Sequence, residues 1–261
     1  MGTALKVLKL LDSFSLQQPE LGLSQIARMN QINKATALRY LTNLADYGMV
    51  EQDPQSKLYS IGTAPLRLAN LREAAKPRLT AARIVMKAQV LKVHETMHMS
   101  LLKSDQLQTT LVEETQAHSV RISIGTSEIL PLHATASGIV SLAFGPRNLL
   151  QHVLDGSLPT YSEHTLTNPD RLMDLVDETL HKGWCESVSG YETGVHGFAA
   201  PIFGEEQTAI GAIACVIPQP RVTSDLRSAV LDALSIASKE ITSVYGGQFP
   251  ANYRLNQLQT S

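Results

Sequence analysis

Polar side chains at helical spacing near the start of the chain could contact a nucleic acid. Five of them fall within ten positions: Lys34, Thr36, Arg39, Tyr40 and Asn43. An arginine guanidinium can bond to O6 and N7 of a guanine, an asparagine amide can pair with an adenine, and a lysine neutralises phosphate. We therefore predict that Arg39, Asn43 and Thr36 read bases and that Lys34 contacts the DNA backbone.

A single helix must carry these side chains on one face. Residues 34–48 have apolar side chains at intervals of three and four, and Asn33 and Gly48 suit its two ends. Its inner face is expected to hold Ala37, Leu38, Leu41, Leu44 and Ala45. The helix could then dock on its own domain and present the polar face, Tyr40 included, to a major groove.

The neighbouring segments predict a winged helix-turn-helix around this helix. Residues 4–14 have a helical apolar pattern, and Ser24 is expected to cap a second helix and to face DNA. Two short strands, 50–52 and 58–61, enclose a wing whose tip carries Lys57. A cation at a wing tip would meet the DNA backbone or the minor groove.

Length and charge indicate two domains of different character. The 261 residues are enough for two cores. Residues 1–76 carry nine Lys or Arg and six Asp or Glu, whereas residues 77–261 carry thirteen and eighteen. We predict a winged helix-turn-helix domain at 1–62, a linker helix at 63–76, a regulatory domain at 77–247 and a flexible tail at 248–261.

Composition argues against several other classes of protein. With 43% hydrophobic residues and no apolar run of about 18 residues, we expect no spanning helix and no membrane contact. The N-terminal stripe is broken by lysines, which argues against a signal peptide and for the cytoplasm. Cys185 and Cys215 are too few for a disulfide framework or a zinc quartet, so we expect no cofactor and no metal.

The second part of the chain alternates predicted strands and helices. Strand patterns include 120–124, which alternates strictly, and a hairpin is expected across 204–207. A helix over 169–182 has a complete set of boundary signals, and 224–246 predicts a long final helix. This pattern predicts an α+β sensor-like domain in which helices pack on a mixed sheet.

Ordered motifs along the chain resemble the IclR family. The first part carries LSQIA, KATALRYLTNLADYGMVEQD and a wing ending in LYSIG. The second part carries LPLHATASG, GYETGV followed by AAPIF, and AIGAIACVIPQPRVTSD, and the resemblance covers roughly residues 3–247. It implies a bacterial transcription regulator with an N-terminal winged helix-turn-helix and a C-terminal GAF-like α/β effector-binding domain. It also implies a dimer or tetramer on a pseudo-palindromic DNA operator.

The resemblance further implies a pocket for a small-molecule effector. Carried over by position, the turn after LPLH, a loop after Trp184 and the AIACV strand would supply Ala136, Ser137, Ser187, Gly197, Ala214 and Val216, and Ile122 would join them. A helix beginning near Ala136 would point N–H groups at an anion, as a carboxylate site requires.

Departures from the family pattern change the expected ligand. Family members that bind small carboxylates have an acidic residue in place of Ser187, a cysteine in place of Gly197 and serines in place of Ala214 and Val216. Apolar groups cannot satisfy a carboxylate's buried oxygens. We therefore expect a more apolar ligand, such as an aromatic acid, or a weak effector, and expect glyoxylate-sized acids to fit less well.

Two alternatives use side chains of the second part. An enzyme could recruit His133, Ser137, Cys185, Glu186 and His196, although the chain has no nucleophile elbow, phosphate-binding loop or HExxH motif. We therefore expect no enzyme. A metal-responsive regulator could use His94 and His98, spaced i and i+4, but two ligands leave a zinc site incomplete.

A third alternative is a helix-turn-helix that binds protein rather than DNA. The basic balance of residues 1–76 and the Arg39 and Asn43 face favour DNA. Salt-dependent binding to promoter DNA would separate the two readings, because release of counterions weakens DNA binding steeply with salt.

Overall fold

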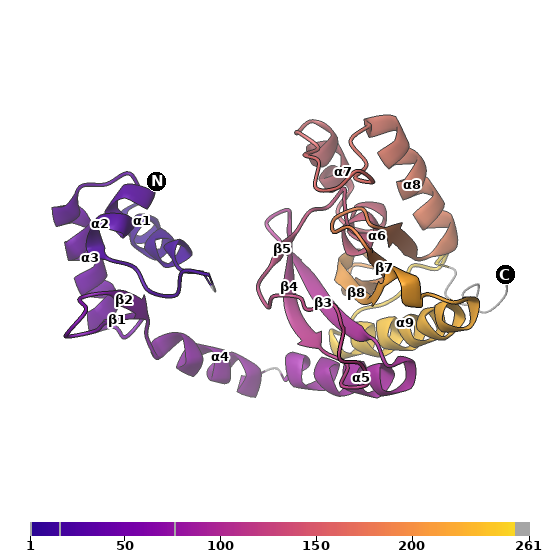
Figure 1. Cartoon of the computed structure of the whole chain (residues 1–261), viewed down its shortest axis with the longest axis horizontal. Helices are drawn as coiled ribbons and strands as arrows, with labels where there is room; N and C mark the ends of the chain where they lie inside the picture. The colour runs from indigo at the N-terminus through magenta and orange to yellow at the C-terminus, as the bar shows by residue number, and fades with distance from the viewer. Residues whose placement is uncertain (1, 16, 76, 254–261) are drawn as a thin grey trace. The chain divides into compact units, whose positions relative to one another are not determined.

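The computed structural model describes residues 2–15, 17–75 and 77–253. Contacts between Cα atoms divide the chain into two compact units, residues 1–77 and 78–261 (Figure 1). Lys76 and the last eight residues of the predicted tail lie outside the described residues. No helix in the described segments is long and apolar enough to cross a membrane.

The N-terminal unit is a winged helix-turn-helix followed by one further helix. Its elements are α1 (Thr3–Lys9), the 3-10 turn η1 (Leu10–Ser13), α2 (Leu23–Met29), α3 (Lys34–Asp46), β1 (Val50–Gln52), β2 (Tyr59–Ile61) and α4 (Ala64–Ala75). β1 and β2 pair antiparallel, and Leu21 bridges to Tyr59 beside them. The core gathers buried side chains from η1, α2, α3, both strands and the segment before α2: Leu10, Leu21, Ile26, Tyr40, Leu41, Leu44, Val50 and Tyr59.

The recognition helix α3 is rotated relative to the expected faces. Asn33 caps it by accepting a hydrogen bond from the Thr36 N–H at 2.8 Å, and Gly48 follows it with a φ of +80°, both as predicted. Tyr40, expected on the polar face, is only 7% exposed, whereas Leu38, expected inside, is 46% exposed. The buried positions 37, 40, 41 and 44 form the tighter i, i+3, i+4, i+7 stripe, so Tyr40 is a core residue.

The start of α2 also differs from the prediction. Its N-cap is Gly22, whose N–H donates to Gln25 Oε1 at 2.8 Å, and the helix begins at Leu23. Ser24 is therefore not the cap, but it remains exposed in the first turn. The Gln25 side chain satisfies the Gly22 N–H, and the Gly22 carbonyl oxygen accepts from the Gln25 N–H at 2.9 Å, so this helix end forms without a serine side chain.

A six-stranded antiparallel sheet forms the centre of the C-terminal unit. Its strands are β3 (Thr96–Lys103), β4 (Gln106–Glu113), β5 (Ile129–Leu130), β6 (Cys185–Val188), β7 (Val195–Phe203) and β8 (Ala209–Pro218), in the order β5-β4-β3-β8-β7-β6. Every recorded pairing is antiparallel, so the expected mixed sheet is wrong. The domain is nevertheless α+β, as predicted, and consistent with a GAF-like fold.

Helices cover both faces of this sheet (Figure 1). α5 (Arg78–Val93) and α9 (Ser224–Val244) pack on one face, over a core that includes Met97, Phe198 and Ile213. α6 (Ala136–Phe144), α7 (Arg147–Leu154) and α8 (Pro169–Lys182) lie over the other. Asn168 caps α8 and Gly183 ends it with a φ of +82°, as predicted, because both signals are local.

Four segments of the C-terminal unit differ from the expectation. Residues 120–124 are irregular rather than a strand, and no strand was expected at β6 and no helix at α7. Residues 248–253 of the predicted flexible tail pack instead on the domain. The Gln248 N–H donates to Gly204 O at 3.2 Å and the Tyr253 hydroxyl to Gly183 O at 2.7 Å.

Candidate DNA interface and effector pocket

The outward face of α3 presents the predicted base-reading side chains to solvent. Arg39 and Asn43 are exposed and four positions apart, so they share one face. Thr36 is half-buried at the edge of that face, and its backbone N–H is taken by the Asn33 cap. The face can therefore reach base edges chiefly through Arg39 and Asn43.

The rotation of α3 adds candidates that the sequence analysis missed. Leu38 and Thr42 are exposed beside Arg39, and the Arg39 guanidinium lies 5.5 Å from the centre of the Tyr40 ring. An aliphatic side chain such as Leu38 can contact a thymine methyl group. The sequence holds one sign of this exposure: Leu38 does not belong to the apolar i, i+3, i+4, i+7 pattern formed by residues 37, 40, 41 and 44.

The wing is a tight turn held by its own acidic side chain. Asp53 accepts hydrogen bonds from the N–H groups of Gln55 at 3.0 Å and Ser56 at 2.6 Å, and these bonds lower the pKa of its carboxyl. Lys57 occupies the left-handed region with a φ of +58° and is exposed. The turn therefore fixes the backbone that carries the predicted phosphate contact.

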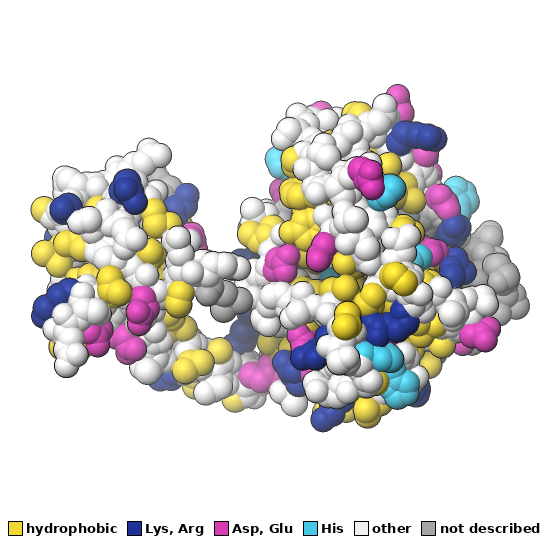
Figure 2. Space-filling model, viewed as in Figure 1, with side chains coloured by type: hydrophobic (Ala, Val, Ile, Leu, Met, Phe, Trp, Pro, Cys, Tyr) yellow, Lys and Arg dark blue, Asp and Glu magenta, His cyan; other side chains and the backbone are white. Residues whose placement is uncertain are grey.

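The cations on the visible face of the N-terminal unit are spread out. On its visible face, Lys and Arg side chains are separated by uncharged and hydrophobic groups (Figure 2). Lys34 and Ser24 are both exposed, at the starts of α3 and α2. Non-specific affinity grows with the number of phosphates neutralised, and this face offers no dense basic patch to a DNA backbone.

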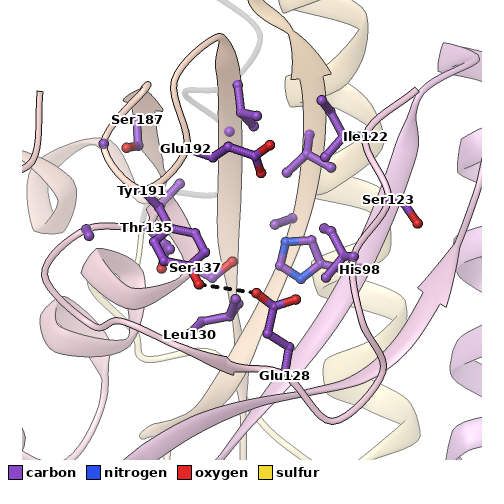
Figure 3. A pocket seen from close by; sticks show the side chains of 18 residues that line it. His98, Ile122, Ser123, Glu128, Leu130, Thr135, Ser137, Ser187, Tyr191 and Glu192 are labelled. Carbon is purple, nitrogen blue, oxygen red and sulfur yellow. Dashed lines mark hydrogen bonds between the residues drawn. The ribbon is translucent and has the colours of Figure 1, made fainter. Parts of the chain in front are cut away.

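A pocket in the C-terminal unit brings together all seven predicted effector residues. Ile122 comes from the irregular segment before β5, Ala136 and Ser137 from the start of α6, and Ala214 and Val216 from β8 (Figure 3). Ser187 and Gly197 face each other as a pair on β6 and β7, not on a loop as expected.

The N-terminus of α6 forms one end of the cavity. Thr135 caps it by accepting from the Gly138 N–H at 3.0 Å and donates its own hydroxyl proton to Pro131 O at 3.0 Å. The N–H groups of Ala136 and Ser137, first in the helix, have no acceptor within it. These N–H groups can therefore receive an anion.

Two glycines allow the close packing of this end. A Cβ on Gly138 would lie 2.4 Å from Leu132 O, and one on Gly190 would lie 2.7 Å from Ala134 O. Both contacts are with backbone, which cannot move aside as a side chain can. The turn before α6 and the loop after β6 therefore approach as they do only because these positions lack side chains.

Several polar residues of the cavity were not predicted. His98, Glu128, Tyr191 and Glu192 line it together with the seven (Figure 3). The Tyr191 hydroxyl donates to Glu128 Oε1 at 3.3 Å, and the Gly125 N–H donates to Glu128 Oε2 at 3.1 Å. Burial and the neighbouring Glu128 carboxylate raise the pKa of Tyr191, which keeps its phenol protonated.

His98 lies on the sheet floor of the cavity and is 4% exposed. Its Nδ1 lies 3.2 Å from Ser100 Oγ, which in turn lies 3.3 Å from Thr109 Oγ1. Burial lowers the pKa of His98 to about 4, so the ring is neutral near pH 7. The sequence signal was the spacing of His98, Ser100 and the other inward residues of β3, two apart on a strand.

The residues considered for an enzyme do not form one catalytic group. His133 Nε2 lies 3.0 Å from Pro159 O and lines a different hollow from Ser137. Burial raises the pKa of Cys185 to about 12, so its thiol is not a ready nucleophile. These side chains are therefore not arranged as one catalytic site.

Glu186 and His196, from the same set, join an ion-paired cluster between β6, β7 and α9. His196 Nε2 lies 2.7 Å from Glu186 Oε1, and Arg227 donates to Glu186 Oε2 at 3.0 and 3.1 Å. Burial raises the pKa of Glu186, but the hydrogen bonds from His196 and Arg227 outweigh it and hold that pKa at about 2. The Arg227 guanidinium also lies 5.0 Å from the centre of the Trp184 ring.

The two histidines considered for a metal site do not lie on one face of a helix. His94 ends α5 with a φ of +58° and is exposed, whereas His98 is buried on β3. The two rings therefore do not share a helix face. Among the described residues no three His, Cys, Asp or Glu side chains are grouped to hold a metal ion.

Family models match most of the chain. The model of the IclR helix-turn-helix domain matches residues 3–54, and the model of the C-terminal domain of the bacterial transcriptional regulator IclR matches residues 66–243. Together they cover both units and the recognition helix, the wing strand β1 and the effector cavity.

Relatives of known role and solved structures agree with these models. The Pca operon regulatory protein of Acinetobacter baylyi is 27% identical over 92% of this chain and 87% of its own length, and the transcriptional repressor IclR of Escherichia coli is 26% identical over 92% and 88%. A solved IclR regulator of a Silicibacter species has 34% identity and a TM-score of 0.90, over 97% of this chain and all of the other. An IclR homologue from Microbacterium hydrocarbonoxydans, complexed with 4-hydroxybenzoate, has 22% identity and a TM-score of 0.79, over 93% and 100%.

Proposed function

Because the chain belongs to the IclR family of bacterial transcriptional regulators, with a DNA-binding helix-turn-helix and an effector-binding C-terminal domain, we propose how its two units divide the work. The N-terminal unit reads a specific operator through Arg39 and Asn43, with Thr36 at the edge of the same face and Lys34, Lys57 and Ser24 on the backbone. The C-terminal unit holds a small organic acid, and the bound acid changes the affinity for that operator.

One observation carries the effector part of this proposal. Seven residues from five segments converge on one cavity at the N-terminus of α6. The first N–H groups of the helix suit a carboxylate, and Ile122, Val216 and other apolar side chains suit an apolar body. An aromatic acid meets both requirements better than a two-carbon acid, and the 4-hydroxybenzoate complex supports that a chain of this fold can hold one.

We also propose that the protein acts in the cytoplasm as a homodimer or tetramer. A pseudo-palindromic operator needs two recognition helices, and α4 exposes Leu66, Leu68 and Leu71, which one chain leaves uncovered. Light scattering of the purified chain tests this part, and a monomer at operator-binding concentrations would contradict it.

The proposal is tested by measuring DNA binding and acid binding separately. Fluorescence anisotropy with DNA from upstream of the gene should show specific binding that weakens steeply as salt rises. Thermal shift with a panel of acids should show stabilisation by benzoate-sized acids and a smaller effect of glyoxylate. Equal affinity for unrelated DNA would refute specific recognition of an operator. Stabilisation by glyoxylate alone would refute the preference for benzoate-sized acids.

A further inference from the structure

One wall of the effector pocket is a segment without regular secondary structure, residues 115–124. Ile122, Ser123 and Ile124 line the pocket, and the Ile122 side chain points into it (Figure 3). Among the described residues, the main-chain groups of this segment form no hydrogen bond with other main-chain groups. Segments whose backbone is unpaired open more readily than strands and helices do.

The other irregular wall of the pocket is held by its backbone. Residues 189–194, between β6 and β7, also line the pocket. The Ser189 N–H donates to Val195 O at 2.7 Å, and the Gln219 N–H donates to Gly194 O at 2.7 Å. Opening this wall would break main-chain hydrogen bonds, so residues 115–124 are the part of the pocket that opens at the lower cost.

Side chains rather than main-chain pairs hold the segment in place. Arg121 Nε and Ser123 Oγ both donate to the carboxylate of Glu114, at 2.8 Å. These two bonds shape the segment but do not tie it to a distant part of the domain. Among the described side chains, Arg221 is the one from outside the segment that donates to its backbone, with Nη2 3.1 Å from Val120 O.

A buried carboxylate orients Arg221. This arginine belongs to the 3-10 turn η2 (Gln219–Arg221), which follows β8. Its Nε lies 2.8 Å from Oε1 of Glu95, and Glu95 is only 1% exposed. The N–H groups of a guanidinium form a rigid fork, so this ion pair directs Nη2 toward the segment. His118 Nε2, from the segment itself, lies 3.8 Å from the same carboxylate oxygen.

We propose that residues 115–124 are the gate of the effector pocket and that Arg221 is the positioning residue that holds this gate shut. Opening breaks the hydrogen bond from Arg221 to Val120 O, withdraws Ile122 from the pocket and leaves a path for a small organic molecule. Glu95 acts through Arg221. This inference rests on the proposed effector function, since a gate serves a ligand that enters and leaves.

Trypsin measures the opening of the gate without any ligand or DNA. Arg121 is exposed in the middle of the gate, but a protease needs several residues around the cut bond to be released, so cleavage before Ile122 follows the open population. Arg221→Ala should speed this cleavage roughly tenfold, the usual effect of losing one hydrogen bond to a charged group. Cleavage after Arg147, at the exposed start of α7, is counted in the same digest and should keep its rate. An unchanged rate after Arg121 would overturn the inference.

Further variants separate the role of Arg221 from a general loss of stability. Arg221→Ala leaves Glu95 buried without its cation, so it is also combined with Glu95→Gln, which removes the unpaired charge. This double variant should show the same fast cleavage after Arg121, whereas Arg171→Ala, at an exposed arginine of α8, should match the wild type. Slow cleavage in the double variant would assign the effect to the buried charge and refute the gate.

Glu95→Gln alone tests how Arg221 is oriented. Arg221 then keeps its hydrogen bond to Val120 O but loses the carboxylate that directs it. We expect a smaller rise in the cleavage rate after Arg121 than Arg221→Ala produces. A rate equal to that of the wild type would show that Glu95 does not act through Arg221.

Exchange of a fluorinated probe tests the gate with a ligand present. 4-Fluorobenzoate is titrated into the full chain, and fluorine NMR gives its rates of entry and release. Arg221→Ala should raise both rates several-fold and change Kd less than either rate, because the lost hydrogen bond belongs to the gate. Equal rates in wild type and variant would refute the gate. If the probe does not bind, the proposed class of effector is refuted, and the cleavage rates of the free chain still decide whether Arg221 holds the segment.

Discussion

The recognition helix and the effector cavity place their polar side chains in opposite environments. Arg39 and Asn43 are exposed on α3, whereas Ser137 and His98 are 2% and 4% exposed. An exposed side chain can be replaced with little change in folding. A buried one is part of a packed arrangement, so its replacement changes both the site and the fold. The two units should therefore respond differently to substitution.

Gly138→Ala should produce the largest contrast between the units. The new Cβ would lie 2.4 Å from Leu132 O, so the turn before α6 must move. We expect a loss of about 3–5 kcal/mol and a melting temperature lower by on the order of 10 °C. Trp184, the one tryptophan in the sequence, reports unfolding of the C-terminal unit by fluorescence.

Gly2→Ala is the matched control for that substitution, because nothing lies within 4 Å of the added Cβ. It should leave the Trp184 transition within about 1 °C of the wild type. A similar small change for Gly138→Ala would show that the end of the cavity is not tightly packed.

Glu186→Gln should destabilise the C-terminal unit in a pH-dependent way. The pKa of Glu186 is held at about 2, below its ordinary value of 4.5, so its ionisation stabilises the folded chain above about pH 5. That contribution disappears as the pH falls from about 5 to about 2. We expect about 2 kcal/mol lost at pH 7 and little difference from the wild type near pH 2.5.

Urea unfolding followed at Trp184 measures this difference at each pH. Glu163→Gln, at an exposed carboxylate, serves as the control and should change little at any pH. A stability difference that stays constant from pH 7 to pH 3 would assign the effect to packing rather than to charge.

Arg39→Ala should weaken operator binding without affecting folding. Loss of a bidentate contact to guanine costs about 1–3 kcal/mol, a factor of roughly ten or more, for the operator only. Anisotropy with operator and random DNA measures both affinities. Arg147→Ala, at an exposed arginine of the other unit, should change neither. Equal losses on the two DNAs would leave Arg39 a phosphate contact.

Lys57→Ala should have the smallest effect. It removes one cation from the wing, so we expect a loss of only a few fold on every DNA and a salt dependence shallower by about one unit of slope. A loss confined to the operator would instead place Lys57 at a base.

Local signals in the sequence predicted much of the fold. Asn33, Asn168, Gly48 and Gly183 mark helix ends through hydrogen bonds or backbone angles that they set themselves. The face of α3 was harder, since Leu38 fits an apolar pattern locally and only tertiary packing of the 37, 40, 41, 44 stripe leaves it outside. The alternation at 120–124 failed because no neighbouring strand pairs with it.

The effector pocket could be predicted only in part, because tertiary packing rather than local sequence brings several of its residues together. Ala136 and Ser137 follow a recognisable turn, so their place at the cavity was accessible from sequence. His98, Glu128 and Glu192 reach the cavity only because β3, the segment before β5 and the loop after β6 meet in space. Their separation along the chain gives no local signal, and the strand register that turns His98 inward becomes clear only from the sheet.

Operator affinity measured with and without a bound acid tests the central claim most directly. With a benzoate-sized acid at saturation, established by calorimetry, we predict that the wild-type affinity changes by at least fivefold, as a coupling of about 1 kcal/mol or more requires. An acid that saturates the cavity and leaves operator affinity unchanged would contradict the account.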